Sequence, residues 1–113
     1  MIRIVSQSVP DAVRGALQAI NDGDSDGLRN CFHHQAVIDE LGRLIIGTEA
    51  IRLWCIELFE RRGATVSNAM IVNESPVRTA MRARVGWDGA DESPGTFTFD
   101  VENGLITMLR ISD

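Results

Sequence analysis

The chain has 113 residues, of which 44% are hydrophobic, and its 16 acidic residues outnumber its 11 basic residues to give a net charge of -5. This length suits a single domain, residues 1–113, that buries roughly two-thirds of the surface exposed by the unfolded chain. The negative charge repels a phosphate backbone on average, so we expect no nucleic-acid partner. No apolar run approaches the roughly 18 residues of a membrane span and no secretory leader is recognisable, so we expect no membrane partner and a cytoplasmic protein.

The residues that most often bind metals are few and poorly spaced. Cys31 and Cys55 form no pair of the kind that binds zinc, and we expect two small buried thiols. His33 and His34 are adjacent, so on a helix they point about 100° apart and cannot chelate one ion together, although either could be an acid or base at a cavity mouth. The sequence predicts no metal site, and we expect no cofactor.

An apolar stripe at helical spacing predicts a first helix over about residues 9–21. The stripe consists of Val9, Ala12, Val13, Ala16, Leu17 and Ile20. The following DGDSDG, residues 22–27, has the acidic spacing that opens a calcium loop, but His33 replaces the glutamate required at the twelfth position. We therefore expect a boundary between two helices: Gly23 ends the first helix, and Asp24 or Ser25 caps a second, short one.

The rest of the chain alternates between strand and helix signals before becoming strand-rich. The short second helix has an apolar face of Leu28, Cys31 and Phe32, and residues 36–41 and 43–47 predict a hairpin joined at Gly42. Thr48 opens a third helix, whose stripe is Ile51, Trp54, Cys55, Leu58 and Phe59. Four strands are predicted near residues 65–73, 77–87, 96–102 and 105–111, separated by breaks at ESP, DGADESPG and NG. Helices followed by strands indicate an α+β fold with an antiparallel sheet.

The run from residue 16 to residue 54 resembles the front half of the nuclear transport factor 2-like superfamily, in particular its SnoaL-like (polyketide cyclase) branch. The matching residues are Gly23, Asp24, Asp26, Leu28, Phe32, Ala36, Val37, Asp39, Glu40, Gly47, Glu49, Ala50, Ile51 and Trp54. The later strands and their closing NG hairpin match too, so the resemblance covers nearly the whole chain. It implies a cone-shaped, curved antiparallel sheet, cystatin-like or nuclear transport factor 2-like, that wraps around three N-terminal helices.

The same resemblance implies a cavity inside the cone and, in most members, a homodimer, but it specifies little chemistry. Members include isomerases, dehydratases, epoxide hydrolases, cyclases and many proteins that are not enzymes. In the steroid-isomerase relatives, the carboxylate that shuttles protons is the second acid of a pair on the strand after the second helix. That acid corresponds to Glu40 here, and Asp39 is the first of the pair.

The alternation of side chains along a strand separates the two acids. Ala36, Ile38 and Glu40 share one face of the strand, whereas Asp39 lies on the other. If Glu40 enters an apolar cavity, desolvation raises its pKa and prepares it to accept and return protons near neutral pH. The alternative is a solvated carboxylate beside the turn at Gly42.

The sequence departs from the steroid-isomerase pattern at the groups that would stabilise an oxyanion. It contains no tyrosine, and the positions expected to face the cavity on the fifth strand are Phe97, Phe99 and Val101. Each missing donor forgoes a rate contribution of about 10² to 10³. We therefore expect neither that isomerisation nor a dehydratase that relies on tyrosine, and no arginine can be placed for an epoxide-hydrolase set.

The last hairpin can close in two registers. If Asn103 and Gly104 alone form a type I′ turn, Phe97 lies opposite Arg110, and the guanidinium of Arg110 points into the cavity.

If residues 102–104 instead form a three-residue loop with Gly104 as a bulge, Leu109 and Ile111 face the interior. We favour this second register because it keeps the inner face apolar and leaves Arg110 outside.

The expected cavity walls and the expected outer face follow from the same alternation. The candidate ligand-binding residues are Ile38, Trp54, Met81, Phe97, Phe99 and Leu109. Arg78, Arg82 and Arg84 share the opposite face of their strand, where we favour pairing with acids such as Asp100 over an anion site. Ile106 and Met108 would make that outer face half apolar, which predicts a homodimer through it.

Two functions remain open at this point. One is a proton-transfer enzyme of isomerase or cyclase type that acts on a small hydrophobic substrate with Glu40 as its base. The other is a module without catalysis that binds a small hydrophobic ligand or serves dimerisation.

Overall fold

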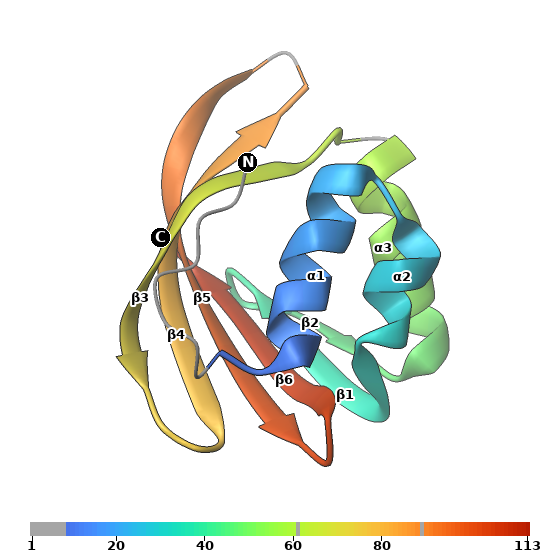
Figure 1. The fold of residues 1–113 in the computed structure, drawn as a ribbon. Helices are drawn as coiled ribbons and strands as arrows, with labels where there is room; N and C mark the ends of the chain where they lie inside the picture. Colours follow the sequence, from blue (N-terminus) through green and yellow to red (C-terminus); the bar gives the residue numbers. More distant parts are fainter. Residues whose placement is uncertain (1–8, 61, 89) are drawn as a thin grey trace.

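The computed structural model describes residues 9–60, 62–88 and 90–113. Six strands form one curved sheet in the order β2-β1-β6-β5-β4-β3, and three helices lie against one face of it (Figure 1). The predicted α+β class is therefore confirmed. Because the sheet curves around the helices, one face of each strand points toward them and the other points away.

The first two helices are separated as the sequence predicts. Helix α1 spans Asp11–Asp22, and Gly23 ends it in the left-handed conformation with φ 67. Helix α2 spans Ser25–Asn30, and the Asp24 carboxylate caps it by accepting a hydrogen bond of 2.9 Å from the Gly27 amide. The acidic stretch thus satisfies free amides at a helix start, which is the usual role of Asp in such a position.

The short helix ends earlier than its apolar pattern suggests. Phe32, predicted on the helix, instead begins strand β1, Phe32–Glu40, where it pairs with Ile106 of β6. The Ile106 amide also donates to the Cys31 carbonyl at 2.8 Å. Pairing with a distant strand overrides the local helical spacing, and it places both His33 and His34 on a strand.

The remaining elements are β2 (Arg43–Ile46), α3 (Thr48–Glu60), β3 (Thr65–Glu74), β4 (Arg78–Trp87), β5 (Ala90–Glu102) and β6 (Leu105–Ser112). Neighbouring strands pair antiparallel with one exception, because β1 and β6 run parallel, with Ile38 opposite Leu109. The sheet is therefore mixed rather than wholly antiparallel. This parallel pair joins the early hairpin to the later strands.

The last hairpin closes with a two-residue turn. Glu102 pairs with Leu105, and the turn residues Asn103 and Gly104 both have positive φ, 52 and 80. Positive φ at both central positions is the geometry of a type I′ turn. This is the two-residue turn of Asn103 and Gly104 that the first of the two predicted registers requires.

A bulge in β6, close to the turn, nevertheless makes Leu109 face the interior, as in the second predicted register, which we favoured. The pairing shifts between Asp100 and Val101, so that Thr107 is extra and Phe99 lies opposite Leu109. Arg110 is consequently exposed on the outer face. The bulge lies at Thr107 rather than at Gly104, and it buries Ile106 completely, so the prediction of Ile106 on the outer face was wrong.

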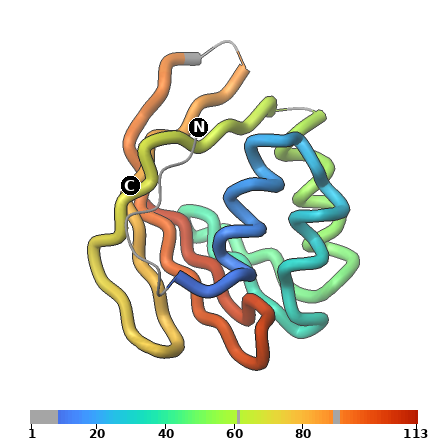
Figure 2. Tube along the Cα trace, in the orientation of Figure 1, coloured from blue at the N-terminus to red at the C-terminus, as the bar shows by residue number. Residues whose placement is uncertain are grey.

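Strand β5 is longer than predicted, because the Glu92–Pro94 segment belongs to it. Ser93 pairs with Val85 and Pro94 with Arg84 of β4. Strand β6 stops at Ser112, opposite Thr96, so Pro94 lies where β5 has no neighbour on that side and its missing N–H costs no sheet hydrogen bond. The β4–β5 hairpin thus extends beyond the end of β6 (Figures 1 and 2).

The core lies between the concave face of the sheet and the helices. Its largest fully buried side chains are Phe99, Leu17, Leu28, Ile38, Ile51, Met81, Ile106 and Leu109. Within the described ranges, no helix is long and apolar enough to cross a membrane.

Candidate functional site

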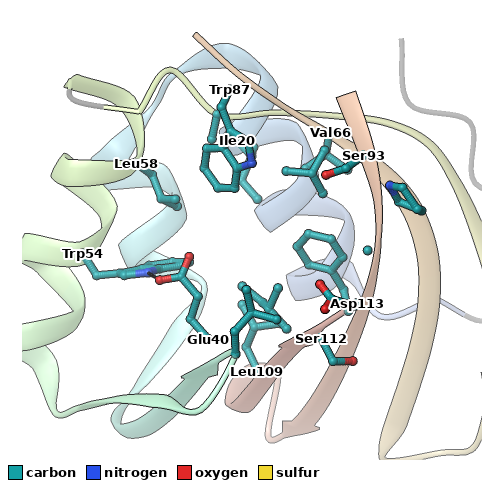
Figure 3. A pocket seen from close by; sticks show the side chains of 17 residues that line it. Ile20, Glu40, Trp54, Leu58, Val66, Trp87, Ser93, Leu109, Ser112 and Asp113 are labelled. Atoms are coloured by element: carbon teal, nitrogen blue, oxygen red, sulfur yellow. Dashed lines mark hydrogen bonds between the residues drawn. The ribbon is translucent and has the colours of Figure 1, made fainter. Parts of the chain in front are cut away.

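A cavity of about 100 Å³, here called the apolar cavity, lies between the sheet and the C-terminal parts of α1 and α3. Figure 3 shows side chains from both layers converging on it. Its aliphatic walls include Ile20, Leu58, Val66, Val85, Leu109 and Ile111. Three aromatic rings, those of Trp54, Trp87 and Phe97, complete the apolar lining.

Glu40 is the one carboxylate among the described residues that is both buried and part of the cavity wall. It lies at the end of β1 and is 9% exposed. The Trp54 indole N–H donates to its Oε1 at 3.2 Å. Figure 3 shows the carboxylate against the Trp54 ring at one side of the cavity.

Arg62 neutralises Glu40 from the segment that follows α3. Its NH1 donates to Oε2 at 2.9 Å and its NH2 to Oε1 at 3.3 Å, so the two groups form a bidentate pair. The guanidinium carbon also lies 4.8 Å from the centre of the Trp87 ring. A planar cation on an aromatic face adds a favourable electrostatic contact, and the paired geometry fixes both side chains.

Two further charges extend this pair into a network of four. Arg43 NH1 lies 3.5 Å from Glu57 Oε1 and 3.9 Å from Glu40 Oε1. Arg62 Nε lies 3.6 Å from the same Glu57 oxygen, too far for a hydrogen bond, and this buried N–H has no hydrogen-bond partner among the described residues. Two arginines face two glutamates, so the network carries no net charge.

The contacts define what Glu40 can do. An ionised carboxylate accepts about four hydrogen bonds, and three are supplied by Trp54 and Arg62. One acceptor position remains, on Oε2. The side chains that contact the Glu40 carboxylate are all hydrogen-bond donors, which suits an ionised carboxylate. The carboxylate could accept one further hydrogen bond from an O–H or N–H of a bound molecule.

The predicted site residues divide between the cavity wall and the core behind it. Glu40, Trp54, Phe97 and Leu109 all line the apolar cavity. Ile38, Met81 and Phe99 do not line it and are at most 1% exposed within the core.

Asp39 lies on the opposite face of β1, away from the cavity. Its carboxylate accepts from the Gly42 amide at 2.9 Å and lies 3.6 Å from Arg110 Nε. The alternation of the strand separates it from Glu40, so its position gives no support to a catalytic role.

The sequence reasoning missed the residues that give Glu40 its environment. Arg62 lies 22 positions further along the chain, outside any predicted element, and no local pattern links it to a buried acid. Trp87, on β4, was not among the predicted site residues either. The usable signal was physical: a buried carboxylate needs a cation nearby.

The outer face carries ion pairs, as the alternation suggested. Arg78 Nε lies 2.6 Å from Asp100 Oδ1, Arg82 NH1 donates to Thr96 Oγ1 at 2.7 Å, and Arg84 Nε lies 3.7 Å from a Glu92 oxygen. The Arg78 hydrogen bond lowers the pKa of the Asp100 carboxyl. These arginines already have partners, which leaves little reason for an anion site there.

Neither cysteine has the environment of a reactive nucleophile. Both are free thiols, and burial raises the pKa of Cys31 and raises that of Cys55 to about 12. A thiol reacts through its thiolate, so neither is activated. In the part of the chain that the structure describes, no three metal-binding side chains gather at one place.

Comparisons with known proteins place the fold. No protein-family model and no curated protein matches the sequence. Among solved structures, a candidate polyketide cyclase of Sinorhizobium meliloti is 24% identical with a TM-score of 0.83, covering 95% of this chain and 100% of that one. A Mycobacterium tuberculosis protein, RV0760c, in complex with estradiol-17beta-hemisuccinate is 24% identical with a TM-score of 0.75, covering 88% of each chain.

A computationally designed 17-OHP binder is also similar, with 23% identity and a TM-score of 0.78 over 90% of this chain and 87% of that one. Likeness at this level of identity establishes architecture. The chain has a nuclear transport factor 2-like fold, as its sequence pattern indicated.

Proposed function

We propose that this protein binds a small, largely apolar cyclic molecule in the apolar cavity and orients it by one hydrogen bond to Glu40. The observation that carries the proposal is an apolar cavity with the buried Glu40 carboxylate in its wall and one acceptor position open on Oε2. Ligand sites commonly combine apolar walls with a few fixed polar groups. The ligand's polar group is therefore a donor, such as a hydroxyl.

The volume of the cavity limits the ligand. At about 100 Å³ it is smaller than the roughly 300 Å³ at which drug-sized sites begin, and closer to the cavity of about 150 Å³ that holds benzene in an engineered protein. Two similar structures support small-molecule binding by this architecture, one with estradiol-17beta-hemisuccinate and one designed for 17-OHP. Here we propose a ligand of about one ring.

The test compares phenol with toluene, which share a ring but differ in the hydroxyl. We expect the indole N–H resonance of Trp54 to shift with both, and phenol to bind about tenfold more tightly because its O–H donates to Glu40. Glu40→Gln should remove most of that preference. Asp39→Asn, which changes the neighbouring carboxylate on the other face, should leave it intact.

Two results would reject the proposal. One is the absence of saturable binding by either compound, and the other is an equal preference for phenol in the wild type and in Glu40→Gln.

Proton transfer is the second candidate, favoured by the position of Glu40 in the cavity wall. As base, Glu40 would take a proton from a carbon next to a ligand carbonyl and return it to a neighbouring position. The Arg62 pair opposes this, because a protonated Glu40 leaves a partly buried guanidinium without its counter-ion. We therefore rank binding first.

Hydrogen–deuterium exchange at the ring carbons of cyclohexanone in heavy water measures this chemistry directly. Exchange accelerated by the wild type and by Asp39→Asn, but not by Glu40→Gln, would support proton transfer. Exchange at the buffer rate in all three would leave only binding.

We also propose a homodimer through the outer face of the sheet, in the cytoplasm. Leu44 and Ile46 on β2, at one edge of the sheet, and Met70 on β3, at the other edge, are 59%, 62% and 59% exposed. A partner subunit across the outer face would cover these apolar side chains. The free thiols suit a reducing compartment. Sedimentation of the wild type should give twice the mass of Ile46→Glu, and equal monomer masses would reject the dimer.

A further inference from the structure

A second cavity, here called the polar pocket, lies near the opposite end of α3 from the apolar cavity. It has a volume of about 100 Å³ and is lined by Arg29, Phe32, His33, His34, Thr48 and Ile51. The end of α2, the start of β1 and the start of α3 meet at this corner of the fold (Figure 1). The Thr48 hydroxyl donates to the His34 carbonyl at 3.1 Å and joins the strand to the helix start.

Arg29 is distinguished from the other described arginines by its lack of a partner. Arginines 14, 43, 52, 62, 78, 82, 84 and 110 each make an ion pair or a side-chain hydrogen bond. Within the described residues, no such contact involves Arg29. In a chain with a net charge of -5, a guanidinium left without an acid has a donor fork available to an external anion.

The imidazole rings of His33 and His34 supply further hydrogen-bond donors to the polar pocket. The His33 and His34 ring centres lie 4.1 Å apart, which the irregular pairing of β1 with β6 allows on neighbouring residues. His33 Nδ1 accepts from the Gln35 amide at 3.0 Å, so its neutral ring carries the proton on Nε2 and can donate outward.

The surrounding acids do not close the pocket. None of its lining residues is acidic. Glu49, in the first turn of α3, is held by Arg52 at 2.6 Å, and the field of Asp26 also acts on Arg52. Glu102 lines a separate hollow of about 270 Å³ beside the last hairpin, which shares His33 with the polar pocket, and Glu102 and His33 form no ion pair.

We propose that Arg29, His33 and His34 form a binding site for a small inorganic oxyanion of phosphate size. A cavity needs roughly 10–15 Å³ of accessible volume to hold one water molecule, so a pocket of about 100 Å³ has room for a tetrahedral oxyanion. The guanidinium supplies a bidentate contact to two oxygens, and an imidazole N–H supplies a third. The site is separate from the apolar cavity, so a failure of the oxyanion proposal would not affect the function proposed for that cavity, and the reverse also holds.

The test is a titration with inorganic phosphate at pH 7, against potassium chloride of equal ionic strength, followed through the two histidine ring resonances. We expect a saturable shift with phosphate, absent with chloride. Arg29→Gln should weaken binding at least tenfold, and Arg52→Gln, a nearby arginine outside the pocket, should change it less than twofold. Because Arg29 makes no ion pair or side-chain hydrogen bond with the described residues, its variant should fold normally, with unchanged Trp54 and Trp87 indole resonances.

Three results would overturn the site. They are an equal response to chloride, an unchanged phosphate affinity in Arg29→Gln, and an equal loss in Arg52→Gln, which would indicate general screening by positive charge.

Discussion

The two cavities at the ends of α3 handle charge in opposite ways. At the C-terminal end, Glu40 is buried in an apolar wall and a bidentate arginine, a tryptophan N–H and a second glutamate–arginine pair surround it. At the N-terminal end, Arg29 and two histidines line a pocket without any acid. One site is internally neutral, whereas the other has donors in excess.

The difference shows where each site can accept a partner. A buried charge must be paired inside the protein, because its desolvation costs several kcal/mol, so Glu40 keeps only one acceptor position for a ligand. A half-buried cation remains hydrated, so it can lack an ion-pair partner within the protein at little cost in folding free energy. We therefore assign an uncharged, donor-bearing ligand to the first site and an anion to the second.

Removal of Arg62 should have the largest effect, because buried Glu40 then loses its bidentate partner and keeps only the exposed Arg43, 3.9 Å away, as a nearby cation. We expect Arg62→Gln to lower the free energy of unfolding by about 2 kcal/mol, less than for a fully buried pair since Arg62 is partly exposed. Urea denaturation measures this directly.

The matched control is Arg29→Gln at the other end, which should stay within about 0.5 kcal/mol of the wild type. Equal losses of unfolding free energy in Arg62→Gln and Arg29→Gln would contradict the distinction between a paired arginine at one end of α3 and an unpaired one at the other.

Glu40→Gln should cost less than Arg62→Gln, about 1 kcal/mol in urea, because the remaining Arg62 can still reach Glu57 and solvent. The amide oxygen also keeps one acceptor for Trp54. A double variant that carries both changes should be more stable than Arg62→Gln alone, since no unpaired charge remains. A double variant less stable than either single one would contradict the ion-pair account.

The smallest effect is expected at the outer face, where the Arg78 hydrogen bond lowers the pKa of Asp100. A depressed carboxyl pKa contributes stability above the unfolded value, about 3.9, and that contribution disappears as the pH falls through the folded pKa. Asp100→Asn should therefore cost about 0.5 kcal/mol at pH 7 and less at pH 2.

Asp91→Asn, at an exposed carboxylate of the same strand, is the control and should match the wild type at both pH values. A loss in Asp100→Asn that persists undiminished at pH 2 would mean that packing, not charge, is responsible.

Much of the fold was predictable because its signals are local. Gly23 and Asp24 separate two helices through backbone conformation and capping, and the alternation of β1 alone separates Glu40 from Asp39. Alternation along the later strands assigned Phe97 and Leu109 to the interior, and helical spacing assigned Trp54 to the apolar face of the third helix. These inferences need no knowledge of which distant residues meet.

The errors arose where distant pairing decides the structure. Phe32 joins a strand because β6 offers it a partner, and the bulge at Thr107 reverses the face of Ile106. Pro94 fits a strand only because β6 ends before it. Arg62 and Glu40 are joined by the fold across 22 positions, and the lack of a partner for Arg29 becomes visible only when all neighbouring acids are placed.

The sequence supplies natural reporters for both sites, since its two tryptophans line the apolar cavity and its two histidines line the polar pocket. The most direct test is one NMR experiment in which phenol and then inorganic phosphate are added to the same sample. We predict that phenol shifts the indole resonances and leaves the histidines in place, and that phosphate does the reverse. Phenol that moves the histidines as strongly as the tryptophans, or that moves neither, would contradict the account.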